Sequence, residues 1–491
     1  MTGQIGAAYL VAALLFVLGI RFLGSPVTAR RGNWLAAVGM AIALVATFFY
    51  QGIDLGNLWF IGPALVLGAV IGAGSARRVK MTDMPQMVAI FNGMGGGAAA
   101  LVSFLEFLHR TLGHLSISPA EGATMALGAA IGSVSFSGSS VAFVKLQELM
   151  KGNALRYRWV RGLNVVLVAG IVALGVLILT GTTNVAVFGA LIALALVLGL
   201  VLVLPIGGAD MPVVISLMNS LTGLAAALTG FVLSNELLIV AGALVGASGT
   251  MLTQLMARAM NRPLTNVLFA GFGGTALGEG SVAAPGTVRE VTSEDAAVLM
   301  SYSNQVVIVP GYGLAVAQAQ HQLRELSDLL IDAGVRVKYA IHPVAGRMPG
   351  HMNVLLAEAD VPYSQVFEMD QINGELPSTD VALIVGANDI TNPGARDDPG
   401  SAIYGMPIIN VDYAQHIIVL KRSMRPGFAG IDNPLYLNTK TAMLFGDAKD
   451  SLGRLVADLK ASRVTRKPAQ VASTATGSDV AAKPEHSHVA T

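Results

Sequence analysis

The 491-residue sequence predicts a membrane all-α helical bundle of about nine spans, followed by a soluble α/β domain with a parallel, doubly wound sheet. The first observation is composition: 53% of the residues are hydrophobic and 12% are charged, about half the charged share of ordinary globular proteins. The second is the placement of charge. Residues 1–262 hold 14 Lys and Arg against 7 Asp and Glu, whereas residues 263–491 hold 17 against 23. Two parts of different chemistry explain both observations.

Nine apolar stretches in the first part are long enough for a bilayer, which takes about 20 residues per helix. They lie at residues 5–24, 34–50, 57–75, 85–107, 122–144, 160–180, 184–205, 211–233 and 236–257. No basic segment precedes the apolar run from Tyr9 to Ile20, which therefore predicts a first span rather than a cleaved signal peptide. Buried helices of a soluble protein are the alternative that this many long stretches disfavour. We expect residues 1–261 to form the membrane domain.

The basic residues predict the orientation of these spans. Thirteen of the 14 Lys and Arg before residue 263 follow spans one, three, five and nine, and only Arg110 lies in an alternate connection. The positive-inside rule assigns the basic connections to the cytoplasm. We therefore expect a multi-pass protein of the cell (inner or plasma) membrane, with its N-terminus outside and its C-terminal domain cytoplasmic.

Spans four and five are dense in small residues, which let helix backbones approach closely in lipid. These residues are Gly93, Gly95, Gly96, Gly97, Gly132, Ser133, Ser135, Ser137 and Gly138. A narrow polar path through the bundle is an alternative that the sequence leaves open. Asn92 and Asn219 are candidates for this path, with Asp210 at the cytoplasmic mouth of span eight, because polar groups in lipid are usually functional or paired. Asparagines that merely join helices are the other interpretation.

After a glycine-rich stretch at residues 262–290, which predicts a flexible linker, strands alternate with helices. This alternation predicts a parallel sheet in residues 291–463, and the composition of residues 464–491 predicts a disordered tail. The expected strands are Gln305–Val309, Val335–Ile341, Gln365–Met369, Val381–Val385, Pro407–Val411 and His416–Leu420, with helices Gly313–Asp332 and Asp447–Leu459.

The turn after the first strand carries a variant of the dinucleotide fingerprint, in which Gly311, Gly313 and Val316 give G-x-G-x-x-V. Glycines allow the tight turn and the close approach of the backbone to a pyrophosphate, so a Rossmann-like domain is expected. Because Val316 replaces the third small residue, a plain strand-to-helix turn is the alternative. The second strand ends at His342 without the acid of an NAD site, whereas Lys421, with Arg422 and Ser423 after it, offers cations for a 2′-phosphate. This favours NADP over NAD, against the interpretation of a solvated surface pair.

Other chemistry is less well supported. The sequence has no cysteine, which excludes disulfides, thiolate metal sites and cysteine nucleophiles. We find no metal-ligand cluster and no arrangement of a nucleophile with a base.

Five segments resemble the proton-translocating NAD(P) transhydrogenases, beta-subunit type. They are Gly207–Val214, His342–Asn353, Gly386–Asp389, Lys421–Met424 and Leu444–Lys449, and the resemblance extends over residues 1 to about 463. It implies an enzyme that transfers a hydride between NAD(H) on a partner subunit and NADP(H) on this chain, coupled to proton translocation. It also implies alpha subunits that carry the NAD(H)-binding domain and further transmembrane helices, a dimer of alpha–beta units, and no nucleic acid.

The resemblance also assigns residues, while no residue of this chain is expected to be catalytic. The implied NADP(H) contacts are Gly311, Tyr312, Gly313, Val316, Val344, Ala345, Gly346, Arg347, Met348, Pro349, Gly386, Ala387, Asn388, Asp389, Ile390, Gly405, Met406, Lys421, Arg422, Ser423, Met424, Arg425, Pro426, Gly427, Phe428, Asp447 and Ala448. Phe428 stands where the family more often has Tyr, so a hydroxyl hydrogen bond is lost there. His342 and Asp389 are either protonation sensors for coupling or caps of their loops.

Many bacterial relatives have His where Asn92 stands, and asparagine cannot titrate. The membrane half of the sequence has only two histidines, His109 and His114, and both fall in an external connection. We therefore expect a partner helix to supply the titrating group. An ion channel or transporter with a C-terminal nucleotide-sensing domain is the alternative function. The Gly386–Asp389 and Lys421–Ser423 segments argue against it, as does the lack of ionisable residues at mid-membrane.

Overall fold

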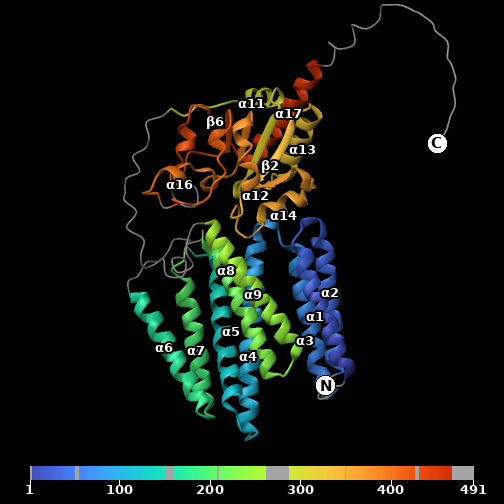
Figure 1. Ribbon diagram of the computed structural model, residues 1–491, viewed down its shortest axis with the longest axis vertical. Coiled ribbons are helices and arrows are strands. Elements are labelled where there is room, and N and C mark those ends of the chain that lie inside the picture. Colours follow the sequence, from blue (N-terminus) through green and yellow to red (C-terminus); the bar gives the residue numbers. More distant parts are fainter. Residues whose placement is uncertain are drawn as a thin grey trace, which may run out of the picture.

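The computed structural model describes residues 3–49, 55–147, 149–150, 159–206, 210–260, 287–348, 350–401, 403–425 and 431–466. A bundle of long helices forms one end of the molecule, and a sheet covered by shorter helices forms the other (Figure 1). The expected linker falls mostly on residues 261–286 and most of the expected tail on residues 467–491, and both lie outside the described residues.

Within the described residues, nine helices are long and apolar enough to cross a membrane, as predicted. They are α1 (Gly3–Leu23), α2 (Pro26–Phe48), α3 (Leu58–Arg78), α4 (Met84–Leu112), α5 (Pro119–Leu146), α6 (Trp159–Leu179), α7 (Val185–Val203), α8 (Met211–Val232) and α9 (Glu236–Ala259). Two short 3₁₀ turns, η1 (Leu55–Asn57) and η2 (Met81–Asp83), precede α3 and α4.

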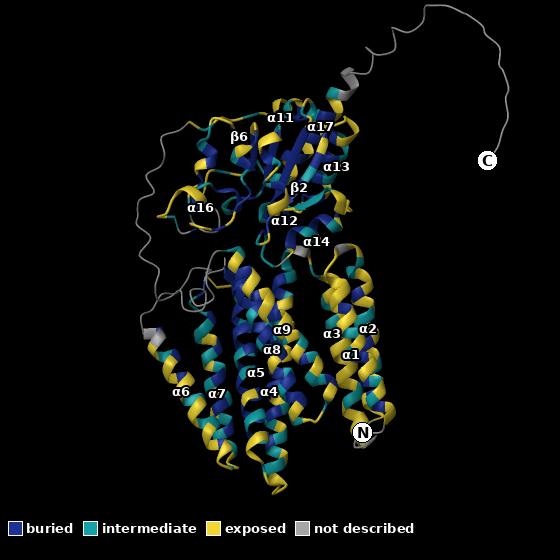
Figure 2. Cartoon of the chain, viewed as in Figure 1, coloured by how far each residue is buried: buried dark blue, intermediate teal, exposed yellow. Residues whose placement is uncertain are grey.

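Small residues set how closely these helices pack. A Cβ atom on Gly132 of α5 would lie 2.5 Å from the carbonyl oxygen of Gly96 on α4, and one on Gly242 of α9 would lie 2.3 Å from the backbone nitrogen of Ala227 on α8. Backbones at these crossings leave no room for a side chain. The helices α5 and α8 are the most buried, whereas α3 has no buried residue among those described (Figure 2).

The second part contains six parallel strands in the order β3-β2-β1-β4-β5-β6. The strands are β1 (Gln305–Pro310), β2 (Arg336–Ile341), β3 (Val366–Glu368), β4 (Val381–Val385), β5 (His416–Lys421) and β6 (Thr441–Phe445). In register, Val307 of β1 lies between Lys338 of β2 and Ala382 of β4. Every residue of β1 and β4 is buried, because helices cover both faces of a parallel sheet.

Helices and 3₁₀ turns connect and cover these strands. They are α11 (Ser293–Ser301), α12 (Tyr312–Val316), α13 (Gln320–Asp332), α14 (His351–Glu358), η5 (Tyr363–Gln365), α15 (Met369–Ile372), η6 (Leu376–Ser378), η7 (Asp389–Thr391), α16 (Gly394–Asp397), η8 (Val411–Tyr413), η9 (Pro434–Leu437) and α17 (Ala448–Arg466). The last helix ends at Arg466 and so continues past the expected start of the tail at residue 464.

The expected strand at Pro407–Val411 is wrong. Proline has no N–H for a ladder, and side chains bind the backbone of this segment instead. The Asn373 amide donates to the carbonyl oxygen of Ile408 at 3.0 Å and accepts from the N–H of Asn410 at 3.0 Å. The sheet takes its sixth strand from Thr441–Phe445, which the sequence analysis did not predict.

The single helix expected at Gly313–Asp332 is two helices. Gln318 has φ +50°, a left-handed conformation that ends α12 before α13 begins at Gln320. The helix after the glycine turn therefore has only 5 residues, and its dipole is weaker than the expected long helix would supply.

Candidate functional site

Three glycines join the turns that follow β1 and β4. Neighbouring strands at this position connect in opposite directions along the sheet, which is where open α/β sheets bind ligands. The N–H of Gly311 donates to the Val385 carbonyl at 2.9 Å, and that of Gly313 donates to the Gly386 carbonyl at 2.9 Å. A Cβ atom on Gly311 would lie 2.4 Å from the Cα of Ala387, and one on Gly386 would lie 2.5 Å from the Cα of Gly313. We call this backbone contact of Gly311, Gly313 and Gly386 the glycine seam.

His342, at the end of β2, is buried and both of its ring nitrogens are engaged. Its Nδ1 accepts the N–H of Val344 at 3.2 Å, and its Nε2 lies 2.8 Å from the carbonyl oxygen of Pro407. Because a carbonyl only accepts, Nε2 carries the proton of a neutral imidazole. Burial lowers the pKa of His342. This geometry favours the loop-capping interpretation of His342.

The loop after His342 turns back on His351, the first residue of α14. Gly346 has φ +106°, and a Cβ atom there would lie 2.5 Å from the Cβ of His351. The N–H of Arg347 donates to Nδ1 of His351 at 3.1 Å. Burial, followed by the charge of Arg347, lowers the pKa of His351 to about 4. The loop from Val344 to Met348 is thus built around a neutral histidine.

Polar side chains meet where β4 and β5 end. Asn388 Oδ1 accepts from the hydroxyl of Tyr436 and, at 3.3 Å, from the amide of Asn433. The Nζ of Lys421 lies 3.5 Å from the Tyr436 hydroxyl and 4.5 Å from the centre of its ring. Burial lowers the pKa of the Lys421 ammonium, and the charge of Asp389 partly offsets this. A half-buried cation of this kind suits an anionic ligand.

The other expected nucleotide contacts lie around these loops. Arg422 is exposed beyond Lys421, and the N–H of Gly446 donates to the Lys421 carbonyl at 3.1 Å, which brings Asp447 beside the end of β5. Met424 and Arg425 are exposed, whereas Ser423 and Ala448 are half-buried. Pro349, Pro426, Gly427 and Phe428 lie outside the described residues.

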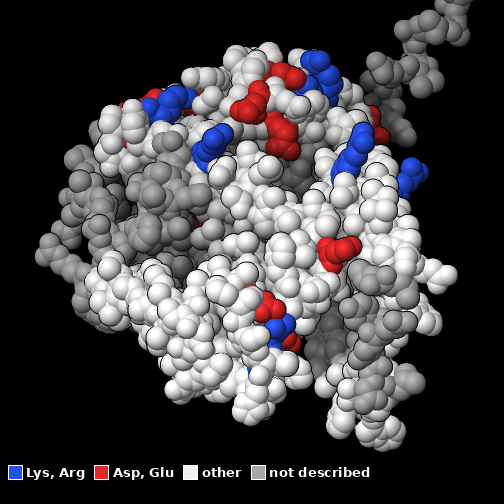
Figure 3. Space-filling model, turned by 60° about the horizontal axis from the view of Figure 1, so that its bottom comes forward, with Lys and Arg blue, Asp and Glu red and all other residues white. Residues whose placement is uncertain are grey.

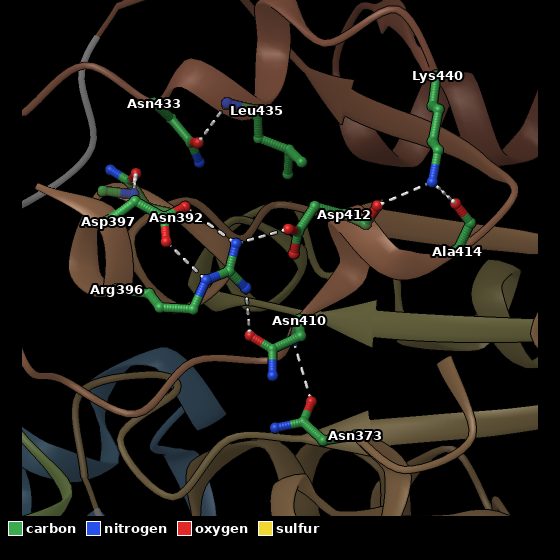
Figure 4. Close-up of polar contacts among 11 residues, drawn as sticks. Asn373, Asn392, Arg396, Asp397, Asn410, Asp412, Ala414, Asn433, Leu435 and Lys440 are labelled. Carbon is green, nitrogen blue, oxygen red and sulfur yellow. Dashed lines mark hydrogen bonds and ion pairs between the residues drawn. The ribbon is translucent and has the colours of Figure 1, made fainter. Parts of the chain in front are cut away.

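Arg396 of α16 reaches Asn410 and Asp412 at the start of η8 (Figure 4). Gly405 and Met406 belong to the segment between these two elements. The guanidinium of Arg396 pairs with Asp397 and Asp412 at 2.8 Å each, and both hydrogen bonds raise its pKa. The N–H of Gly405 donates to the Ala395 carbonyl at 2.7 Å. Arg396 is therefore committed to holding this loop rather than to a ligand.

The strand ends and their loops face the helical bundle (Figure 1). Helix α12 contacts η2 at the start of α4. Arg347 donates through Nη1 to the carbonyl oxygen of Leu146, at the end of α5, at 3.2 Å. With the far end of the bundle turned forward, most of the visible surface carries no charged side chain, and most of the Lys, Arg, Asp and Glu that can be seen lie toward the top of the view (Figure 3).

A polar cluster lies inside the bundle between α4, α5 and α8. The amide of Asn92 donates to Ser139 Oγ at 2.9 Å and to Ser135 Oγ at 3.4 Å. Ser135 and Thr222 share a hydrogen bond of 2.6 Å between their hydroxyls. Asn219 is half-buried on α8, and its side chain forms no hydrogen bond in the described part of the chain, whereas Asp210 is buried at the start of α8. The structure therefore places Asn92 in a network with Ser135, Ser139 and Thr222 that does not include Asn219.

Several of these residues carried no sequence signal. The glycine fingerprint pointed to the seam, and the small serines of span five pointed to the polar cluster. Tyr436 and Asn433 gave no signal, because they reach Asn388 from 48 and 45 residues away. Within the described residues, no group of three or more His, Cys, Asp or Glu side chains is arranged to hold a metal ion.

Fold and site together define a class: a multi-pass membrane protein whose parallel-sheet domain turns its glycine-lined strand ends toward the helical bundle. The family model of the NAD(P) transhydrogenase beta subunit matches residues 5–458. NAD(P) transhydrogenase subunit beta of Rhodospirillum rubrum is 48% identical over 460 residues, which is 92% of this chain and 98% of that relative. The same subunit from a designated strain of that species matches equally well.

The chain belongs to the NAD(P) transhydrogenase beta subunit family. It is a membrane-embedded subunit of an oxidoreductase of NADP(H) and NAD(H), and the name of its relatives implies an alpha-subunit partner. Proton-coupled hydride transfer is consistent with this family.

Proposed function

We propose that this subunit holds NADP(H) at the carboxyl ends of β1, β4 and β5, while the alpha subunit holds NAD(H). The observation that carries the proposal is Lys421, a half-buried cation at the end of β5, with Arg422 exposed beside it. An ammonium and a guanidinium together suit the 2′-phosphate that distinguishes NADP from NAD. No carboxylate follows β2, where an NAD site would bind the ribose, and His342 there is committed to Pro407.

The strand order β3-β2-β1-β4-β5-β6 supports a Rossmann-like domain in residues 291–463. The glycine seam supports a dinucleotide site because it joins the turns after β1 and β4 at the position where open α/β sheets bind ligands. Bound NADP(H) would give or take the hydride. Residues of this chain would orient the nucleotide. Asn388 is fixed by Tyr436 and Asn433, and the loop from Val344 to Met348 is fixed by His351.

The cofactor assignment is tested by calorimetry on the complex of this chain with its alpha partner. We expect the complex to have one site that binds NADP(H) far more tightly than NAD(H). Replacing Lys421 and Arg422 together by alanine removes most of this preference. The matched control is an exposed guanidinium and an exposed ammonium away from the carboxyl ends of the strands, Arg336 at the start of β2 and Lys460 late in α17, whose replacement by alanine leaves the preference intact. Equal affinity of the wild-type site for the two cofactors contradicts the assignment.

We further propose that the polar cluster of Asn92, Ser135, Ser139 and Thr222 lines the proton path, with a titrating group that a helix of the alpha subunit supplies. Support comes from the hydrogen bonds of Asn92 and from the partly exposed Asn219, which is free to meet a partner helix. None of the four cluster side chains titrates near neutral pH.

A dimer of alpha–beta units with the sheet domain in the cytoplasm completes the proposal. A reporter at Asn235, between α8 and α9, is then external.

A further inference from the structure

Three parts of the chain meet at the last turn of α5. The carbonyl oxygen of Leu146 accepts two hydrogen bonds of 3.2 Å each, one from Gln86 Nε2 on α4 and one from Arg347 Nη1 in the loop after β2. The preceding residue, Lys145, is buried and donates through Nζ to three carbonyls at the end of α7, those of Val203, Leu204 and Ile206. The end of α5 is thus fixed to α4, to α7 and to the sheet domain.

The chemistry of a helix end explains why Leu146 attracts both donors. The last carbonyls of a helix have no partner within it and carry the negative end of the helix dipole. A carbonyl oxygen has two lone pairs, and Gln86 and Arg347 fill both. Gln86 is buried, so water does not replace its N–H at this carbonyl. The strength with which Leu146 holds Arg347 therefore depends on Gln86.

Arg347 also belongs to the nucleotide loops. Its guanidinium carbon lies 4.5 Å from the ring centre of Tyr312, which sits between the two glycines of the fingerprint turn. The backbone N–H of Arg347 donates to His351, and this hydrogen bond fixes the backbone from which the Arg347 side chain extends. Phosphate oxygens bind a guanidinium more strongly than a neutral carbonyl does.

We propose that Arg347 is shared between the dinucleotide and the carbonyl of Leu146, and that Gln86 is a positioning residue that sets how strongly α5 holds Arg347. The inference rests on the proposed binding of NADP(H) to this chain. A phosphate that draws Arg347 away leaves Leu146 with the Gln86 bond alone. Because coupling between two sites is reciprocal, a change at Gln86 inside the bundle changes the affinity for the nucleotide.

The same two helices carry the polar cluster. On α4, Gln86 precedes Asn92, and on α5, Leu146 follows Ser139, so both residues lie nearer the sheet domain than the cluster does. A displacement of the last turn of α5 therefore moves the two helices that carry Asn92 and Ser139, because packed helices shift as rigid elements.

The test uses the intact complex of this chain with its alpha partner in lipid nanodiscs, with NADP⁺ binding measured by calorimetry. In Gln86→Leu the carbonyl of Leu146 is left to Arg347 alone, so Arg347 is held more strongly. We expect NADP⁺ to bind about threefold to tenfold more weakly, the range of one neutral hydrogen bond. The control is Asn164→Leu, which replaces another buried membrane amide, on α6, that does not contact Leu146. It leaves the affinity unchanged.

A double-mutant cycle separates this route from a general loosening of the bundle. Arg347→Lys keeps the charge but loses the forked geometry, and Gln86→Leu added to it has no further effect on NADP⁺ affinity if the coupling passes through Arg347. Gln86→Asn, whose shorter side chain withdraws the amide from Leu146, weakens binding in the same direction and serves if Gln86→Leu does not assemble. Unchanged or tighter binding in these Gln86 variants, or an equal loss with and without Arg347→Lys, overturns the inference. A wild-type complex without an NADP⁺ site overturns the proposed function as well.

Discussion

Replacing Gly386 by alanine tests whether the glycine seam holds the sheet domain together. Gly386 has φ +68°, and a Cβ atom there would lie 2.5 Å from both the Cα of Gly313 and the backbone nitrogen of Leu314. A left-handed conformation costs a residue with a side chain about 1–2 kcal/mol. Displacing a packed backbone costs about 1–3 kcal/mol more. We therefore expect Gly386→Ala to lower the free energy of unfolding of the sheet domain by about 2–5 kcal/mol, the sum of the two costs.

Replacing Gly334, in the turn before β2, separates the cost of the left-handed conformation from the cost of displacing packed backbone. Gly334 has φ +89°, but a Cβ atom there meets nothing within 4 Å. Gly334→Ala therefore pays only the conformational cost, about 1–2 kcal/mol. Scanning calorimetry of the purified complex measures both variants, and NADP⁺ binding should fall in Gly386→Ala alone. Equal destabilisation in the two variants would show that the backbone contact at the seam contributes nothing.

Three further outcomes are expected. Because the folded pKa of His351 is about 4 against an ordinary value near 6.5, its contribution to stability is complete above pH 6.5 and is lost as the pH falls toward 4. About 2 kcal/mol should be gone at pH 5, and melting curves of His351→Gln with undiminished pH dependence would refute this. Asn92→Leu removes the hydrogen bond to Ser139 and should stop proton movement in reconstituted vesicles while NADP⁺ still binds; normal pumping contradicts the path. Gly453→Ala, on the exposed face of α17 with free space around it, should stabilise that helix by about 0.5–1 kcal/mol in thermal unfolding, and a loss of stability would count against the helix assignment.

The membrane helices could be predicted from the sequence because their signal is local. A run of about 20 apolar residues is sufficient to identify a span, and the nine predicted stretches correspond to α1 to α9. The largest difference is at α2, which begins at Pro26 rather than at residue 34. The strands β1 and β4 were predicted for the same reason, since both are short, continuous apolar runs. The Pro407–Val411 segment has a similar run and is not a strand, because Asn373 and His342 bind its carbonyls from other loops.

The site was less predictable because its contacts join distant residues. Gly311 and Gly313 of the seam carry the fingerprint motif, whereas the approach of Gly386 to them depends on the pairing of β1 with β4. The contact of Arg347 with Leu146 spans 201 residues, and no pattern in either segment indicates it. The neutral, buried state of His351 likewise depends on how the loop from Gly346 closes over it, which composition and spacing do not reveal.

The glycine seam also bears on the entropy of binding. Two turns from different strands are joined there by paired backbone hydrogen bonds, at a contact with no side chains to rearrange. A ligand that binds against the glycine seam meets backbone that is already ordered. The loss of conformational freedom on binding therefore occurs in the surrounding loops. Substitutions in the loops around the ligand should therefore change the affinity directly. Substitutions in the glycine seam should act mainly through the stability of the domain.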